Sequence, residues 1–181
     1  MSRVICLLSF LGLPLFNNAD ASLEARKVEI STAASFQVFV DEGESFTLVN
    51  IPLRIGLYLT PYLEVEPEVV LTLVEDQDAA SIFSANLAYH FELPSNGKSY
   101  IFVLAGAGFG NASPLHNSAG SVFGGGERTA TILNLGLGNK TFLTNSVAVR
   151  FEFRFQKFSF EGNSFQVNSG YLGFSVFLPE D

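Results

Sequence analysis

The sequence predicts an all-β fold, an eight-stranded antiparallel up-and-down barrel that crosses a membrane, and three observations support this prediction. First, apolar residues alternate with polar or small residues in segment after segment, which is typical of strands whose two faces meet different environments. Second, eight such segments occur, each 10 to 14 residues long, which is long enough for a tilted strand to cross a bilayer. Third, 48% of the residues are hydrophobic and only 15% are charged, against about 25% charged residues in water-soluble domains.

The first 21 residues are predicted to be a cleavable signal peptide. Arg3 precedes an apolar stretch from Val4 to Phe16, and the small-residue pattern Ala19-Asp20-Ala21 follows it. This stretch of 13 residues is shorter than the roughly 20 residues that a helix needs to cross a bilayer. The alternative is a buried or amphipathic first helix, but the apolar residues surround the segment rather than forming one stripe. Residues 22–181 are therefore expected to form a single barrel domain.

Cysteine content and charge exclude several classes of site. Cys6 is the only cysteine and would leave with the signal peptide, so we expect no disulfide and no thiolate ligand or nucleophile in the mature domain. The net charge of −8 argues against nucleic acid as a partner, because phosphates need a basic surface. No run of about 18 apolar residues follows residue 21, which excludes a helical membrane protein. We expect no cofactor and no metal centre.

The alternation is clearest from Ser146 to Lys157, where Val and Phe occupy odd positions and Arg150, Glu152 and Arg154 occupy even positions. No helical period separates residues in this way. The same separation predicts seven further strands, at Lys27–Val40, Leu48–Thr60, Leu63–Val74, Ser81–Leu93, Tyr100–Phe109, Thr129–Lys140 and Phe165–Leu178. In the last of these the apolar phase changes near Ser169-Gly170, which predicts a β-bulge at that point.

The predicted connections alternate between short and long, as in barrels whose strands run up and down through a membrane. The short ones, expected on the side from which the chain enters, are Thr60–Tyr62, Pro94–Lys98 and Thr141–Asn145. The others, expected on the far side, are Asp41–Ser45, Glu75–Ala80, Gly110–Arg128 and Ser159–Ser164. Residues 110–128 form the longest connection and are predicted to be an exposed loop.

Alternation alone would also suit a soluble barrel with its apolar face inside. However, the second face is rich in Gly, Ala, Ser and Asn, which suits a crowded lumen better than a solvated exterior. Eight apolar rows would also overfill the interior of an eight-stranded barrel. We therefore expect the apolar face to meet lipid, since an arginine on the lipid face near the midplane costs roughly 2–4 kcal/mol.

The charged strand residues are accordingly predicted to form an ion-pair network that plugs the lumen. Its expected members are Lys27, Glu29, Arg54, Glu64, Glu66, Glu68, His90, Glu92, Lys140, Arg150, Glu152 and Arg154. Glu64, Glu66 and Glu68 lie on one face at a spacing of about 6.6 Å. We expect them to pair with the arginines across the barrel, because unpaired buried charge is costly; a cation site is the alternative.

Several motifs carry a resemblance to known proteins. They are the strand–turn–strand unit of residues 55–64, the glycine-rich strand of residues 105–110, the unit of residues 135–145, and the last strand with Tyr171, Gly173, Val176 and Leu178. Together they make residues 22–181 similar to the small bacterial outer-membrane β-barrel families typified by the OmpA membrane domain, OmpX and the opacity-type surface proteins. In the last strand, these four residues resemble the assembly signal of those families.

The resemblance implies an outer-membrane protein that is exported by its signal peptide, inserted by the barrel-assembly machinery and surrounded by outer-membrane lipid and lipopolysaccharide. We expect a monomer with a structural or surface-interaction role and no enzymatic activity. Acids of the far rim are candidates for sharing divalent ions with lipopolysaccharide; they are Asp41, Glu42, Glu44, Glu75, Asp76 and Asp78. Two alternatives remain open: a narrow pore, and a lipid-A-modifying enzyme in which His90 and Glu92 act with a serine.

Overall fold

The computed structural model describes residues 26–41, 44–74, 79–93, 98–111, 129–160 and 163–179. The predicted signal peptide lies outside the described residues, as does the predicted loop of residues 110–128 beyond Asn111. Among the described residues, no helix is long and apolar enough to span a membrane.

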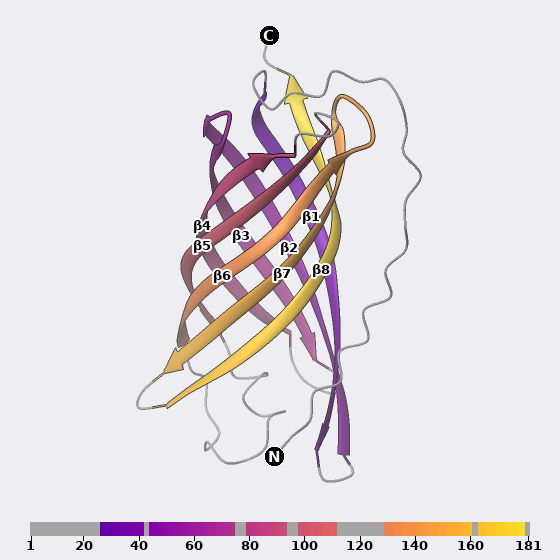
Figure 1. The fold of residues 1–181 in the computed structure, drawn as a ribbon. Coiled ribbons are helices and arrows are strands. Elements are labelled where there is room, and N and C mark those ends of the chain that lie inside the picture. Colours follow the sequence, from indigo (N-terminus) through magenta and orange to yellow (C-terminus); the bar gives the residue numbers. More distant parts are fainter. Residues whose placement is uncertain are drawn as a thin grey trace.

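The described residues form eight strands that close into one barrel (Figure 1). The strands are β1 (Arg26–Asp41), β2 (Glu44–Thr60), β3 (Leu63–Val74), β4 (Ala80–Glu92), β5 (Ser99–Asn111), β6 (Thr129–Phe142), β7 (Val147–Phe160) and β8 (Asn163–Pro179). Each strand pairs antiparallel with the next, and β8 pairs with β1. The predicted fold class, an eight-stranded antiparallel barrel, is confirmed.

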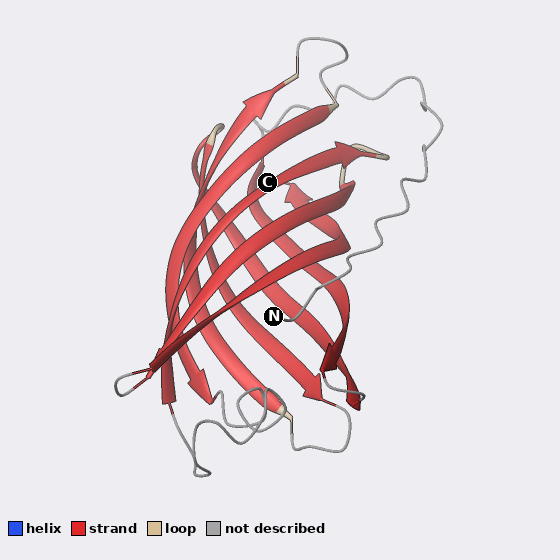
Figure 2. Cartoon of the chain, turned by 60° about the horizontal axis from the view of Figure 1, so that its bottom comes forward, coloured by secondary structure: helices blue, strands red, loops and turns tan. Residues whose placement is uncertain are grey.

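The two ends of the barrel differ in their connections, and we name them accordingly. At the loop end β1 connects to β2, β3 to β4, β5 to β6 and β7 to β8; at the turn end β2 connects to β3, β4 to β5 and β6 to β7. The strongly tilted strands run between these two ends around a common axis (Figure 2). The β1–β2 ladder continues to Asp41↔Glu44, so β2 begins four residues earlier than the predicted strand at Leu48.

Side chains alternate between the lumen and the outer wall along the strands, as the sequence predicts. On the outer wall, Leu53, Leu135 and Phe174 are 50%, 57% and 56% exposed. In the lumen, Arg54 and Arg154 are fully buried. The barrel therefore has an apolar outer wall and a charged interior, the reverse of a water-soluble domain.

Among the described residues, three apolar clusters lie inside the barrel, and two of them lie at the ends of its charged interior. The loop-end cluster consists of Leu48, Val70, Ile82, Ala130, Ile132 and Phe158, with Phe165 and Val167 packed against it. The turn-end cluster consists of Tyr100, Phe142, Ala148 and Phe177, with Tyr58 packed against it. Apolar side chains therefore close both ends of the lumen, while the third cluster, Ala88, Phe102 and Leu104, packs beside the charges between them.

On three adjacent strands the polarity of the two faces inverts towards the loop end. The outward residues of β8 change from Leu172, Phe174, Val176 and Leu178 to Ser164, Gln166 and Asn168, whereas the inward ones become Phe165 and Val167. On β7 the outward phenylalanines give way to Lys157 and Ser159, and on β6 the outward leucines give way to Thr131 and Thr129. We expect this inversion to mark, on these three strands, the level at which the predicted membrane-facing wall ends.

The inversion also explains the change of apolar phase near Ser169-Gly170, where the sequence predicts a β-bulge. The β7–β8 ladder runs in one register from Val147↔Val176 to Phe160↔Asn163, so the bulge prediction is wrong. The apolar phase changes because Phe165 and Val167 join the loop-end cluster inside the barrel, while the backbone continues without interruption.

A hydrophilic maleimide is expected to label Asn168→Cys at least about tenfold faster than Phe174→Cys in nanodiscs containing the folded mature barrel. Asn168 lies on the polar part of the outward face and Phe174 on the apolar part, where lipid excludes the reagent. The mature chain contributes no other cysteine if residues 1–21 are removed. Equal labelling rates would contradict the assignment of the hydrocarbon boundary.

The ladder that closes the barrel, between β1 and β8, is confined to the turn-end part of both strands. It runs from Arg26↔Pro179 to Ala34↔Leu172, beyond which β1 continues its pairing with β2 and β8 with β7. The two strands diverge towards the loop end (Figure 1). There the side chain of Gln37 donates hydrogen bonds to the carbonyl oxygen of Asn168, at 3.1 Å, and to Ser169 Oγ.

Candidate functional site

The candidate site is a buried network of charged side chains in the middle of the lumen. Its members are Glu29 on β1, Arg54 on β2, Glu64, Glu66 and Glu68 on β3, His90 on β4, Lys140 on β6, and Arg150, Glu152 and Arg154 on β7. All occupy inward positions of the two-residue alternation, which turns every second side chain of a strand to the same face. Each is at most 3% exposed, so each charge depends on its neighbours for solvation.

Glu68 connects two arginines at one end of the network. Its Oε2 accepts a hydrogen bond from Arg54 Nε at 2.5 Å, and its Oε1 accepts one from Arg154 Nη1 at 2.6 Å. Ser84 Oγ donates a third to Oε1 at 3.0 Å. Such charge-assisted hydrogen bonds are roughly twice as strong as neutral ones, so Glu68 ties β2 and β4 to the opposite wall at β7.

Arg150 and Glu152 form the centre of the network. The guanidinium of Arg150 binds both carboxylate oxygens of Glu66, through Nη1 to Oε2 and through Nη2 to Oε1 at 3.2 Å. It also donates to Glu152 Oε2 from Nε at 3.1 Å and from Nη2 at 2.8 Å. Glu152 Oε1 accepts a further bond from Arg154 Nε at 2.6 Å. Arg150 thus connects β3 with β7 through the middle of the barrel.

Lys140 organises the part of the network nearest to the turn end. Its Nζ donates to Glu29 Oε2 at 2.5 Å, to Glu64 Oε2 at 2.9 Å and to the Tyr58 hydroxyl at 3.1 Å. Tyr58 in turn donates its hydroxyl proton to Glu29 Oε2 at 2.8 Å. His90 Nε2 lies 2.8 Å from Glu64 Oε2. A single ammonium group therefore joins β1, β2, β3 and β6.

Aromatic rings lie against the cations of the network. The Arg150 guanidinium carbon lies 4.5 Å from the centroid of the Phe102 ring, and that of Arg154 lies 5.3 Å from Tyr171. Lys140 Nζ lies 5.5 Å from the Phe102 centroid. Cation–π attraction of this kind strengthens in desolvated sites, so the rings both exclude water and stabilise the charges.

Residues 4–176 match the sequence profile of a family described as the outer membrane protein beta-barrel domain. This chain belongs to that family. It is therefore an outer-membrane barrel, and its apolar wall faces the hydrocarbon of that membrane. Among curated proteins, no sequence matches the chain.

Two solved structures share the fold of this outer-membrane barrel. The N-terminal β-barrel domain of Pseudomonas aeruginosa OprF is 19% identical, with a TM-score of 0.59, and the match covers 84% of this chain and 98% of that one. Neisserial surface protein A (NspA) is 16% identical, with a TM-score of 0.61 and coverage of 84% and 96%. A de novo designed transmembrane β-barrel also matches, at 9% identity and a TM-score of 0.51, with coverage of 84% and 95%.

Most of the residues expected in the lumen of this outer-membrane barrel are brought together there, but two are not placed as expected. Glu92 is exposed at the last position of β4. It is therefore not a buried member of the network, and this part of the prediction is wrong. Alternation identifies the face of a strand but does not show where the lumen ends. Lys27 belongs to β1, but its side chain lies outside the described part of the structure.

The four residues of the predicted assembly signal occupy both faces of β8. Val176 and Leu178 are 45% and 44% exposed on the outer wall, whereas Tyr171 is buried in the lumen. The Tyr171 hydroxyl donates to Gln156 Oε1 at 3.3 Å. Gly173 lies so close to β1 that a Cβ at this position would overlap the carbonyl oxygen of Thr32. These placements describe the residues in the folded barrel, and their role in assembly stays a prediction.

Sequence reasoning missed Tyr58 and the aromatic residues that enclose the network. Tyr58 lies next to Lys140 and Glu29, and its ring contacts His90 at a centroid distance of 5.5 Å. Phe102, which covers Arg150 and Lys140, is fully buried. The available signal was their inward phase: on β5, Phe102 alternates with the outward residues Ile101 and Val103. The expectation of a lumen filled by ion pairs and small residues gave no reason to use this signal.

Proposed function

We propose that this outer-membrane barrel is a structural or surface-interaction protein with a plugged lumen, which presents the loop of residues 110–128 outside the cell. The observation that carries the proposal is the placement of the ion-pair network between two apolar clusters. A ligand or ion moving along the axis would have to displace Phe158 and its neighbours, the buried ion pairs, and then Phe142 and Phe177.

The cost of breaking the network supports a closed lumen over a narrow pore. Separating Arg150 from Glu66 would leave both charges buried without their closest partner, and breaking a buried pair costs roughly 3–5 kcal/mol. The two apolar clusters add barriers, because they offer a passing ion few polar atoms to replace its water.

The surroundings of His90 support a non-enzymatic role. A catalytic triad needs a histidine held between an orienting acid and a nucleophile. His90 instead contacts Glu64, within a network whose other acids bind arginine or lysine, and its ring lies 5.6 Å from the ring of Phe102. Glu92, the acid considered as its partner, is exposed. We therefore propose that His90 is a structural member of the lumen.

The proposed partners follow from the two surfaces of the barrel. The apolar wall contacts outer-membrane lipid, and the barrel-assembly machinery inserts the chain. Inversion of polarity on β6, β7 and β8 supports a polar collar that lies at the level of lipopolysaccharide. The barrel is proposed to act as a monomer, since every described strand pairs with a neighbour on each side, which closes the wall.

Single-channel recording in planar bilayers tests the closed lumen. The folded mature barrel is expected to give no conductance steps under conditions in which a general porin, as the positive control, gives clear steps.

Analysis of lipid A tests the absence of enzymatic activity. Lipid A from cells expressing the barrel is expected to show no modification. Reproducible conductance steps would replace the proposal with a pore, and altered lipid A would replace it with an enzyme.

A further inference from the structure

Strand β1 changes its hydrogen-bonded neighbours in the middle of its length. Residues 28–32 pair with β2 on one side and with β8 on the other. Ala33 and Ala34 pair with β8 but have no partner on β2. Residues 35–41 pair with β2 but not with β8. Within two residues, β1 thus loses one neighbour and then exchanges it for the other.

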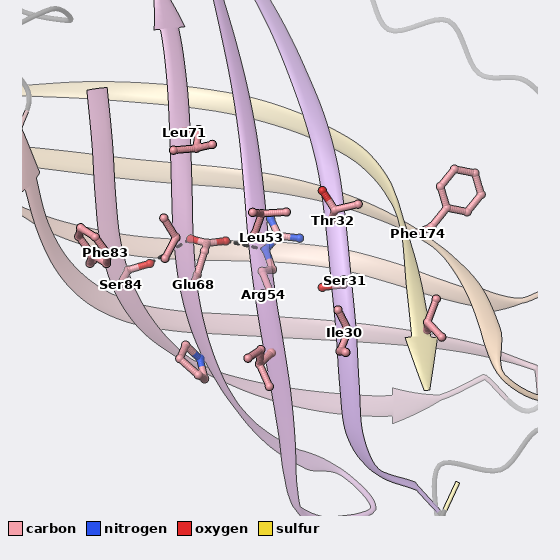
Figure 3. Close-up of a pocket in the computed structure, with 14 residues that line it drawn as sticks. Ile30, Ser31, Thr32, Leu53, Arg54, Glu68, Leu71, Phe83, Ser84 and Phe174 are labelled. Carbon is pink, nitrogen blue, oxygen red and sulfur yellow. Dashed lines mark hydrogen bonds and ion pairs between the residues drawn. The ribbon is translucent and has the colours of Figure 1, made fainter. Parts of the chain in front are cut away.

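The last level at which β1 has a partner on both sides is that of Thr32. Thr32 pairs with Leu53 of β2 and with Phe174 of β8, and it lies between these two residues in Figure 3. The next pair of the β1–β2 ladder, Ser35↔Asn50, is in the same register as Thr32↔Leu53. Neither strand therefore contains an inserted residue, and the gap in the ladder is not a β-bulge.

The gap lies opposite a proline of β2. The common register places Pro52 opposite Ala33. Proline has no N–H to donate to a ladder, and within sheets it interrupts the pairing. The missing pairs are those of Ala33 and Ala34, as the loss of this donor predicts. Pro52 therefore weakens the attachment of β1 to β2 close to the level at which β1 also leaves β8.

Beyond the gap, the hairpin of β1 and β2 forms a two-stranded arm, which we define as residues 35–50. The two strands of the arm pair continuously as far as Asp41↔Glu44. On its β2 side the arm joins the rest of the wall through the ladder that residues 48–50 form with β3. On its β1 side the neighbouring strand, β8, pairs with β7 and diverges from β1 (Figure 1). By ladder pairing, the arm is thus held along one side and only at its base.

The side chain of Gln37 connects the other side of the arm to β8. Its Nε2 donates hydrogen bonds to the carbonyl oxygen of Asn168, at 3.1 Å, and to Ser169 Oγ. Hydrogen bonds between neutral groups contribute little net stability, because water can replace either partner. This contact can therefore break and re-form while the ladders of the barrel stay intact.

We propose that residues 35–50 are a hinged arm, which bends at the gap opposite Pro52 and is held against β8 by the side chain of Gln37. When the Gln37 contact breaks, the arm moves away from β8 as an intact pair of strands, because its own ladder has no gap. Segments with few hydrogen-bonded neighbours open at a lower free energy than the rest of a structure.

Movement of the arm opens the wall between β1 and β8 at the loop end. Phe165 and Val167 lie on β8 beside this opening and pack against the loop-end cluster. The arm is thus a lateral gate to the loop-end part of the lumen. The network residues of these two strands, Glu29 and Arg54, lie on the turn-end side of the gap. The ion pairs therefore stay closed when the arm moves, and the inference is independent of the proposed function.

Distances between spin labels test the arm in the folded mature barrel in nanodiscs. One label is attached at Val40→Cys in the arm and the other at Val103→Cys on β5, the strand opposite β1 in the strand order. Ile30→Cys replaces Val40→Cys in the matched control, because Ile30 lies where β1 has two neighbours. Double electron–electron resonance is expected to give a distance distribution at least about twice as wide for Val40 as for Ile30.

Two substitutions are expected to change the Val40–Val103 distribution in opposite directions. Gln37→Ala removes the contact with β8 and is expected to shift the distribution to longer distances. Pro52→Val supplies an N–H at the gap and is expected to narrow the distribution to the width found for Ile30. A strand end that merely frays would stay wide in Pro52→Val, so this variant distinguishes a hinge from fraying.

Pro67→Val is the matched control for Pro52→Val. Pro67 lies on β3 at a second gap, where Ile55 and Gly56 of β2 have no partner in the β2–β3 ladder, and this gap is outside the arm. Its substitution is expected to leave the distribution of Val40 unchanged. Heat-modifiable migration on gels checks that each variant is folded.

Three results would overturn the hinged arm: equal widths for the Val40 and Ile30 pairs, no shift in Gln37→Ala, or equal narrowing by Pro52→Val and Pro67→Val. The comparison of Val40 with Ile30 needs neither the Gln37 nor the proline variants, so it decides the inference if those fail to fold. Conductance steps of the unmodified barrel would overturn the plugged lumen, whereas equal label distributions would overturn the arm alone.

Discussion

Replacing Arg150 by methionine is expected to lower the free energy of unfolding of the barrel by roughly 3–5 kcal/mol. Methionine fills much of the space of the arginine but leaves Glu66 without its two-point partner and Glu152 without one of its guanidinium groups. Both carboxylates stay buried, and removing one partner of a buried pair exposes the desolvation cost of the other. Urea unfolding of the barrel in lipid vesicles measures the effect.

Lys157→Met on the same strand is the control for this experiment. Lys157 lies on the outward, partly exposed face of β7, so its substitution is expected to change stability by no more than about 0.5 kcal/mol. If Arg150→Met were as stable as Lys157→Met, the network would contribute little to the fold, and the argument for a lumen closed by ion pairs would lose its energetic basis.

Gly173→Ala is expected to weaken closure of the barrel by about 1–3 kcal/mol or more, the range found for overpacked interiors. A Cβ at this position would overlap the carbonyl oxygen of Thr32 and lie 2.5 Å from Ala33 Cα. Both atoms belong to the backbone of β1, which cannot yield as the end of a flexible side chain can. The ladder between β1 and β8 would have to separate at Ala33↔Gly173.

Gly170→Ala provides a matched control on the same strand. A Cβ at Gly170 meets no atom within 4 Å, so this variant is expected to fold like the unmodified barrel. Urea unfolding and heat-modifiable migration on gels compare the two variants. Equal stability would show that the β1–β8 ladder tolerates a larger separation than the structure indicates.

The fold was predictable because a two-residue alternation in the sequence shows directly which side chains share a face of a strand. On β7 the odd apolar and even charged positions separate the two faces, and the small residues of the second face together with the eight apolar rows indicate which face meets lipid. The same argument places Glu64, Glu66 and Glu68 inside. Strand number follows from counting the eight alternating segments, and the alternation of short and long connections supports their up-and-down order.

The pairing within the site was not predictable in the same way. Glu66 and Arg150 are 84 residues apart in sequence, and the stagger of the strands decides that they meet. That stagger also assigns Glu64 to Lys140 and His90 instead of an arginine. Alternation does not show how far along the barrel axis a side chain lies. For this reason Glu92 was predicted to belong to the network, and the changed apolar phase at Phe165 and Val167 was interpreted as a bulge.

The distribution of charge over the network has a consequence for the order in which the protein reaches its final form. The strands of the first half, β1 to β4, contribute four glutamates and one arginine to the network, and those of the second half, β5 to β8, contribute two arginines, a lysine and one glutamate. Before the two halves of the barrel meet, their lumen-facing surfaces therefore carry net charges of opposite sign. When the halves join, four cations meet five carboxylates and most of the charge is neutralised, so we expect the finished cylinder to enter lipid more readily than a half-formed sheet.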